Sequence, residues 1–575
     1  MKKYWIIGGI VIIAAVVAAF FLWPKNLSDE IIVPYVSHQK PLIDPHIPSS
    51  VPIADKLDEA LFDGLFNISA NPSGITYEDG LAELMGIDAN NVVTVRLKPR
   101  KKWHESFSVV RDEEEISVQK ANDILVTSSD LAFTLKRIRR LGSLSPDYVL
   151  VSQAIRDFSF SGPNKDNEIQ FQFHGDREWS QDDIKEVLSF KILPASSEMN
   201  ARQYLNGSGP YLSAGAFEEN LFFFRNPASQ AKIQRLTLAP FIDNSTYMSE
   251  LKSGNINALL GTPFGSHSPI LSDTADYFYK SNISTTFFAL LFNTERLSRE
   301  QRRALRSLLD NKKILQRFFK TGTPQQRHIS DYKGNKDNYE DYLNYSIFPS
   351  SSYYVDEKVV LPLRKQPAAD LSLLPDTVRV QTCLNYGFRE ELSELAEIIN
   401  DPALFGGRIK VNAVKNSEIK KGNYDAVLVA VSGYRSNFMF DLYDVFLRQP
   451  DFAVHKINLI TDSDGKGKRM INPGSFQKDK NFFRIDLGRS SEEREQFVKL
   501  LEYIYGFMAT DEIGDKQAYA QFLDELDQEI ALGSWLFSLP SLAYFSTQFD
   551  EQSIDLYGVA SQLSTIEKWR ERKID

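Results

Sequence analysis

Hydrophobic and polar residues alternate with a period of two in several short stretches of the chain, most clearly in residues 93–97. Such alternation is typical of a β-strand that buries one face. Pro99 and a basic run follow, and they end the strand in a turn. In residues 129–138 the apolar positions recur every three or four residues, which predicts an amphipathic helix with Ser129 or Asp130 as its N-cap.

Strand and helix patterns alternate in the second half of the chain. Residues 377–382 and 407–414 are interpreted as strands on either side of a helix at 389–399, and the stretch 420–431 ends in a third strand. This order predicts an α/β unit with a largely parallel sheet. Two amphipathic helices are predicted within residues 492–530.

Other segments carry weaker signals. Residues 147–173 are interpreted as strands separated by a turn at 161–167, and residues 535–545 as a late strand. Gly64 and Gly254 follow helical patterns, so each is expected to end a helix in the left-handed conformation.

An arginine-rich helix is predicted around residues 302–309. Its leucines form a buried stripe, and Arg302, Arg303 and Arg306 are expected to face water or a neighbouring carboxylate. No catalytic role is predicted for these arginines.

Composition narrows the class of protein. The 575 residues predict two to four domains or lobes, at ~100–200 residues each. The formal net charge is −10, so a nucleic-acid partner, whose phosphates need a basic face, is not expected. Cys383 is the one cysteine, which excludes an internal disulfide framework, and it is interpreted as a core thiol.

The N-terminal residues predict that the protein is directed to a membrane. Lys2 and Lys3 precede the uncharged apolar run Tyr4–Trp23, which has about the ~20 residues needed to cross a bilayer as a helix. The competing interpretation is a cleaved signal peptide with a site at Val17–Ala19. The length of the run favours an uncleaved anchor, with the lysines in the cytoplasm and everything after Lys25 outside it.

Motifs for catalysis and metal binding are missing from the sequence. The seven histidines are scattered, without the spacing of metal ligands. There is no nucleophile elbow or phosphate-binding loop, and residues 461–467 lack the ligand spacing of a calcium loop. The sequence therefore predicts no catalytic residue, no metal site and no cofactor.

Several short motifs follow one another in a set order: Gly80–Glu83, Trp103–His104, Asn206–Leu212, Arg225–Pro227, Gly254–Asn257 and Gly422–Asp425. Together they resemble the extracellular solute-binding protein family 5, the peptide- and nickel-type receptors of ABC importers, which include the dipeptide- and oligopeptide-binding proteins. The chain departs from the family at Glu105 and Ser106, which replace an Asp-Gly pair, and in an acidic insert at residues 111–115.

The resemblance implies an α/β, bilobed, periplasmic-binding-protein-like fold of type II, in the large peptide-receptor subclass, with an accessory subdomain. The apolar run Tyr4–Trp23 adds one preceding transmembrane helix. The resemblance divides the chain into an anchor and linker, a first lobe with the accessory subdomain, a second α/β lobe, and a return to the first lobe with a C-terminal tail: 1–28, 29–266, 267–531 and 532–575. A solute would be held in the cleft between the lobes and released when a hinge opens.

The same resemblance implies a set of ligand contacts, one in the first lobe and the others in the second: His38, Ala430, Val431, Ser432, Gly433 and Tyr434. Peptide receptors of this family carry a Trp and, three residues later, an Asp that pairs with the α-ammonium of the peptide. The matching positions here hold Val431 and Tyr434. A buried ammonium without a carboxylate is costly.

Three explanations of this departure stay open. Asp441 or Asp444 supplies the carboxylate, or the ligand has no free amino terminus, or no ligand binds. Two functions follow. The chain is a membrane-anchored solute-binding protein that delivers peptides or another small solute to an ABC permease, or it is a transport-inactive receptor fold used as an extracytoplasmic scaffold or interaction subunit of a membrane complex.

Overall fold

The structure is a computed structural model. It describes residues 29–36, 41–47, 52–71, 74–112, 115–145, 147–160, 167–175, 179–217, 219–241, 250, 253–262, 276–320, 342–349, 370–384, 388–431, 442, 445–446, 459–461, 469–472, 474, 476–487, 492–510, 513–554, 563 and 565–572. The predicted anchor at residues 4–23 lies outside these ranges. No helix within them is long and apolar enough to cross a membrane.

Among the described residues, four strands form what we call the first sheet, in the order β1-β12-β11-β10: β1 (Glu30–Val36), β10 (Tyr211–Phe217), β11 (Asn220–Arg225) and β12 (Arg235–Phe241). β1 and β12 are parallel, although about 200 residues separate them. Ile31, Val33 and Leu236 pack with α2 (Pro52–Leu61) and with Trp569 in one core. We call this the first core, and it joins both ends of the described chain.

The accessory sheet is antiparallel throughout and has the order β4-β5-β9-β8: β4 (Ala82–Ile87), β5 (Val92–Leu97), β8 (Ile155–Phe160) and β9 (Glu168–Phe173). Helices bury one of its faces: α3 (Ser128–Leu141), α4 (Asp147–Ala154) and α5 (Gln181–Val187). Val93 and Val95 face Leu131 and Leu135 in this core. The strand and helix predicted here are confirmed.

Two local predictions in this region are wrong. The N-cap of α3 is Thr127, which forms a capping box with Asp130 at the third helical position. Residues 147–154 form α4 rather than a strand, because Val151 and Ala154 bury themselves in the accessory core. Periodicity alone cannot separate a short buried helix from a buried strand.

The two glycines predicted to end helices behave differently. Gly254 has a φ of +75°, as predicted for a left-handed residue. Gly64 does not end a helix, because α2 stops at Leu61 and Gly64 pairs with Lys191 in an isolated bridge. A Cβ on Gly64 would lie 2.6 Å from the carbonyl oxygen of Phe66, so close approach of two backbones explains this glycine.

Two of the sequence motifs meet at a buried corner. His104 Nε2 donates to the carbonyl oxygen of Gly209, and His104 Nδ1 accepts from the backbone N–H of Gly207. Burial lowers the pKa of His104 to about 4, so the ring is neutral. Next to it, Trp103 Nε1 donates to Asp130. The tryptophan–histidine pair therefore ties the glycine-rich turn to the start of α3.

Smaller elements decorate these sheets: the hairpins β2 (Phe66–Asn71) with β3 (Gly74–Asp79), β6 (Phe107–Asp112) with β7 (Glu115–Lys120), and β18 (Leu459–Thr461) with β19 (Arg469–Ile471). Of the acidic insert, the described residues Arg111, Asp112 and Glu115 pair within the β6–β7 hairpin. The 3-10 turns are η1 (His104–Ser106), η2 (Gly142–Leu144), η4 (Leu371–Leu373), η7 (Glu551–Ser553) and η8 (Ile566–Lys568).

In the described part of the chain, a second sheet has six strands in the order β13-β20-β14-β17-β15-β16: β13 (Ala258–Thr262), β14 (Tyr277–Phe292), β15 (Val378–Thr382), β16 (Ile409–Ala413), β17 (Ala426–Val431) and β20 (Gly533–Ser546). β17, β15 and β16 are parallel, as predicted from residues 377–431. The neighbours of β14 are antiparallel, so the complete sheet is mixed.

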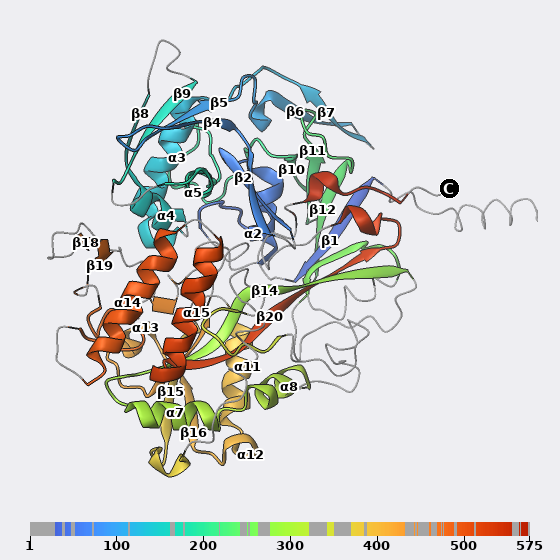
Figure 1. The fold of residues 1–575 in the computed structure, drawn as a ribbon. Coiled ribbons are helices and arrows are strands. Elements are labelled where there is room, and N and C mark those ends of the chain that lie inside the picture. The colour runs from blue at the N-terminus through green and yellow to red at the C-terminus, as the bar shows by residue number, and fades with distance from the viewer. Residues whose placement is uncertain are drawn as a thin grey trace, which may run out of the picture.

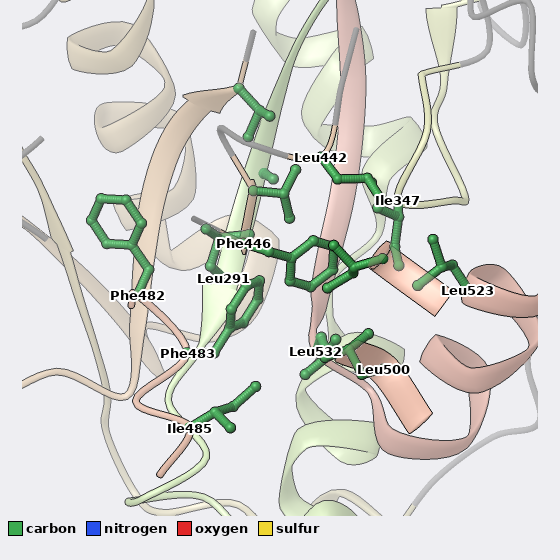
Figure 2. Close-up of a cluster of buried hydrophobic side chains, with 14 of the residues drawn as sticks. Leu291, Ile347, Leu442, Phe446, Phe482, Phe483, Ile485, Leu500, Leu523 and Leu532 are labelled. Atoms are coloured by element: carbon green, nitrogen blue, oxygen red, sulfur yellow. The ribbon is translucent and has the colours of Figure 1, made fainter. Parts of the chain in front are cut away.

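Helices cover both faces of the second sheet: α7 (Arg299–Leu308), α8 (Asn311–Lys320), α11 (Arg389–Asn400) and α12 (Pro402–Phe405) on one, and α14 (Arg494–Ala509) and α15 (Ile513–Ile530) on the other. We name the two clusters beneath them the α11-side and α15-side clusters. Phe288 and Leu290 of β14 face the first, whereas Phe287 and Leu291 face the second. Figure 2 shows part of the α15-side cluster, in which Leu532 lies beside Leu500.

Candidate functional site

Two long strands connect the first core with the second sheet. β14 and β20 pair antiparallel, and Figure 1 shows them side by side through the middle of the molecule. In the first core the rings of Phe278 and Phe545 stack with centroids 5.7 Å apart. Farther along the same strands, Phe288 and Phe537 pack at 5.4 Å in the α11-side cluster. Both strands therefore leave one hydrophobic core and enter another.

The ladder between these strands is interrupted at the crossover. Ile283 pairs with Pro540, and the next pair is Phe287 with Ser538, so the register shifts between them. Proline has no N–H group and cannot donate to a ladder. A ribbon that lacks ladder bonds over a few residues bends there more easily than elsewhere. We call this interruption of the ladder, where both strands pass between the two cores, the hinge position.

The parallel part of the second sheet has a switch point beside this hinge. The chain runs from β15 through α11 to β16, and then through α13 (Asn416–Ile419) to β17 on the other side of β15. Ligands of open α/β sheets bind at the carboxyl ends of the strands where the order reverses. Because β17 is antiparallel to β14, its last residue, Val431, lies opposite Phe287 at the register break.

We call the β15 side of the carboxyl end of β17 its open side, because no described strand pairs with it there. Thr382 of β15 pairs with Leu428, and the next three residues of β17 pair with β14 but with no residue of β15. Among the described strands, no neighbour occupies the β15 side of Ala430 and Val431. An extended chain can add to such an end by β-augmentation, in which main-chain hydrogen bonds supply the affinity.

The first sheet reaches the same region through its β1 edge. Asn257 donates from Nδ2 to the carbonyl oxygen of Glu30 at 2.6 Å and accepts at Oδ1 from the backbone N–H of Ile32 at 2.7 Å. Asn257 is the residue just before β13. Its side chain takes the place of a neighbouring strand, since it forms hydrogen bonds with two backbone groups of β1. β1 is therefore held beside the six-stranded sheet.

The structure describes only part of the predicted ligand set. Ala430 is half-buried against the α11-side cluster, and Val431 is 1% exposed in the α15-side cluster. The remaining predicted contacts lie outside the described residues: His38, Ser432, Gly433, Tyr434, Asp441 and Asp444. Since the side chain of Val431 is in the core, only its backbone is placed to meet a ligand.

A buried ion pair fixes the start of β20, and the sequence predicted only half of this arrangement. Arg306 donates from Nη2 to both carboxylate oxygens of Asp527, at 2.8 and 2.9 Å, and from Nε to the carbonyl oxygen of Gly533. Asp527 also accepts from Trp535 Nε1 and from the N–H of Leu532. The arginine has the expected carboxylate partner, but it is buried rather than facing water.

Arg302 is also buried, and like Arg306 it binds the segment that leads from α15 into β20. Its guanidinium donates to the carbonyl oxygens of Ile530 and Leu297 and to the carboxylate of Glu493. Burial lowers the pKa of Arg302 from its ordinary value, although Glu493 opposes this effect. Glu493 and Ile530 lie roughly 190 to 230 residues away in the chain, so no local pattern could have identified them.

Metal-ligating side chains do not gather in the described residues. No group of three or more His, Cys, Asp or Glu side chains there could hold a metal ion. Cys383 is buried, and its thiol lies 2.6 Å from Asn416 Oδ1.

Comparisons by sequence identify no relative. No protein-family model matches the chain, and no curated protein matches it.

Solved structures match it in fold. NikZ from Campylobacter jejuni, in complex with Ni(L-His), is 16% identical, with a TM-score of 0.56, over 95% of this chain and 100% of that one. The oligopeptide-binding protein AppA from Bacillus subtilis, with a nonapeptide, is 14% identical, with a TM-score of 0.56, over 95% and 99%. The ABC transporter substrate-binding protein CtaP from Listeria monocytogenes is 14% identical, with a TM-score of 0.61, over 95% and 99%. As the motifs predicted, the chain has the α/β fold of the family 5 solute-binding proteins.

Proposed function

We propose that the chain is an extracytoplasmic solute receptor that holds a peptide between two lobes and delivers it to an ABC-type permease. The first sheet, its core and the accessory sheet form the first lobe in this proposal, together with β13 and β20, and the rest of the second sheet with its helices forms the second. The boundaries are those of the sequence analysis, near residues 28, 266 and 531.

One observation carries the proposal. β14 and β20 cross between two cores at a break in their ladder, in a fold shared over 95% of the chain with substrate-binding proteins. Two strands that are interrupted at the same level give a hinge about which lobes can close. The open side of β17 at that level supports a ligand with an extended backbone.

The proposed contacts are those of the resemblance. His38 and the backbone near the end of β1 act from the first lobe, and Ala430–Tyr434 from the second, with Asp441 or Asp444 as the partner of a ligand ammonium.

A test with the purified full chain decides whether it carries a solute. Native mass spectrometry of the detergent-solubilised protein should reveal a co-purifying small species. Small-angle X-ray scattering should show a more compact particle before that species is removed than after. A ligand-free protein whose scattering is unchanged by a mixed peptide pool would contradict the receptor function and favour the scaffold.

The proposal places the protein in the cell membrane through residues 4–23, with Lys2 and Lys3 in the cytoplasm. N-terminal sequencing of the membrane-extracted protein checks this placement. A chain that starts at Met1 supports the anchor, and one that starts at Phe20 shows cleavage.

A further inference from the structure

Residues 342–349, which we call the strap, lie along β20 at the edge of the second sheet. Leu343 forms an antiparallel bridge with Phe537 and packs in the α11-side cluster. Ile347 and Phe348 pack in the α15-side cluster. The strap therefore crosses the edge of the sheet from one face to the other. In Figure 2, Ile347 lies beside Leu523 of α15.

One end of the strap reaches the hinge. Asn344 Nδ2 lies 3.1 Å from Ser538 Oγ, and the hydroxyl donates back to Asn344 Oδ1 at 3.2 Å. Ser538 is the β20 residue opposite Phe287, at the register break. The strap thus holds β20 up to the point where the two cores can bend apart.

The other end is fastened by one carboxyl group of α15. Ser346 Oγ donates to Asp524 Oδ1 at 2.6 Å, and the backbone N–H of Ile347 donates to the same oxygen at 3.2 Å. Asp524 is 4% exposed. Its hydrogen bonds to the strap come from two consecutive residues, so the carboxyl group is a single point of attachment.

Charges around Asp524 do not balance in the described residues. Asp527, one turn later in α15, is also buried, and the guanidinium of Arg306 from α7 is committed to it and to the carbonyl oxygen of Gly533. The buried side chains that α14 contributes to this cluster are apolar, its Tyr503 and Tyr505 are only partly buried, and Trp535 of β20 donates to Asp527. Asp524 therefore faces a second carboxylate without a cation of its own.

These surroundings favour the protonated form of the Asp524 carboxyl group. Burial is the main cause that raises the pKa of Asp524 to about 7, and the charge of Asp527 adds to it, while the hydrogen bond from Ser346 and the charge of Arg306 oppose it. When the strap opens, Asp524 meets water and its pKa returns toward the ordinary value of 3.8.

We propose that the strap is a pH-sensitive latch on the crossover, fastened while Asp524 carries a proton and opened more readily once Asp524 has lost it. The sign follows from linkage. A raised pKa in the closed form stabilises that form fully below the ordinary pKa, and this stabilisation is lost as pH rises through about 7. At higher pH the hinge end of β20 is held less firmly.

Hydrogen–deuterium exchange of the full chain between pH 5 and pH 8.5 tests the latch. After correction for the intrinsic dependence of exchange on pH, opening of the strap amides should increase about fifty-fold from pH 5 to pH 7 and level off above about pH 8. Asp524→Asn keeps both hydrogen bonds to Oδ1 and removes the titration, so its profile should be flat. Glu525→Gln, at the exposed neighbouring position, should behave as the wild type.

A second variant covers the case in which Asp524→Asn does not fold. Ser346→Ala removes a donor that favours the charged carboxylate, so the midpoint of the opening profile should move up by about one pH unit. Identical corrected profiles for the wild type and Asp524→Asn would overturn the latch. A midpoint that Ser346→Ala leaves in place would overturn it equally.

Discussion

At the scale of single residues, several buried polar groups in the described part of the chain are bound to specific partners that lie far away in sequence. Arg137 donates to His46 Nδ1, to Asp44 and to the hydroxyl of Tyr204. Burial lowers the pKa of His46, whose Nε2 donates to the carbonyl oxygen of Lys191. Buried polar groups are nearly always hydrogen-bonded, because the cost of leaving one unpaired exceeds the gain of a typical bond.

Removal of Arg306 should destabilise the second sheet strongly. Arg306→Met leaves the carboxylate of Asp527 buried without its cation, which costs about 3–5 kcal/mol of the free energy of unfolding. Urea denaturation measures this loss. The neighbouring Arg303, which is exposed and donates to the carbonyl oxygen of Glu529, is the control. Arg303→Met should change the free energy by about 0.5 kcal/mol or less.

His104 should make the protein sensitive to acid. Its pKa is lowered to about 4 by burial, against an ordinary value of 6.5, so its stabilisation is complete above pH 6.5 and is lost as pH falls through 4. The total is about 3 kcal/mol. His104→Gln should therefore show a shallower loss of stability between pH 7 and pH 4 than the wild type. Parallel acid limbs for wild type and His104→Gln would count against this account.

At the scale of elements, turns and strand edges are set by close backbone approach. A Cβ on Gly207 would lie 1.9 Å from the carbonyl oxygen of Leu61, so this turn packs directly on the end of α2. The outer edge of β16 is closed differently, because Asn400 of α11 bonds both the N–H and the carbonyl oxygen of Val411. An occupied edge cannot pair with another chain.

Substitution of Gly207 should weaken the packing of the glycine-rich turn on the end of α2. Gly207→Ala places its methyl group against backbone that cannot turn aside, and we expect a loss of about 1–3 kcal/mol or more, seen as a lower midpoint of thermal unfolding. Gly514, in α15, has open space for a methyl group, with no other atom within 4 Å of a Cβ at that position. Gly514→Ala should stabilise the helix by about 0.5–1 kcal/mol. Equal effects of the two substitutions would be inconsistent with the packing described.

At the scale of the whole molecule, the proposed function rests on how two cores share two strands. The first core contains residues from β1 near the start of the described chain and Trp569 near its end, whereas the second sheet is built from the middle and late segments. Closure about the crossover would bring the carboxyl end of β17 toward the first sheet.

Peptides with a free amino terminus should bind weakly unless Asp441 or Asp444 reaches the ligand ammonium. By the motif resemblance, Tyr434 is expected at the position of the family's carboxylate, and a missing charge-assisted bond costs about 1.5–3 kcal/mol, or roughly ten- to hundredfold in affinity. Tyr434→Asp should recover this factor in calorimetry with a pool of tri- to pentapeptides, and N-acetylated peptides should not gain. The prediction would be contradicted if the wild type bound these peptides with submicromolar affinity and the Asp441→Ala and Asp444→Ala variants kept that affinity.

Much of the fold was predictable from local pattern. The alternation in residues 93–97, the helix over 389–399 and the parallel strands of 377–431 all recur in the structure. The misassigned segment at 147–154 was short and apolar, so either element could have buried it. Most of the anticipated ligand contacts lie outside the described residues, so they stay predictions.

The sequence by itself determined which segments are strands and helices and in what order they come, because side-chain periodicity and turn residues act over a few positions. It also carried the motif order that indicates the family's fold. Only the tertiary structure decided that Arg306 meets Asp527, that Asp524 holds the strap, and that the β14–β20 ladder is interrupted between Pro540 and Ser538. These pairings join residues more than 150 positions apart, and their partners are chosen by packing and charge balance, which no local pattern records.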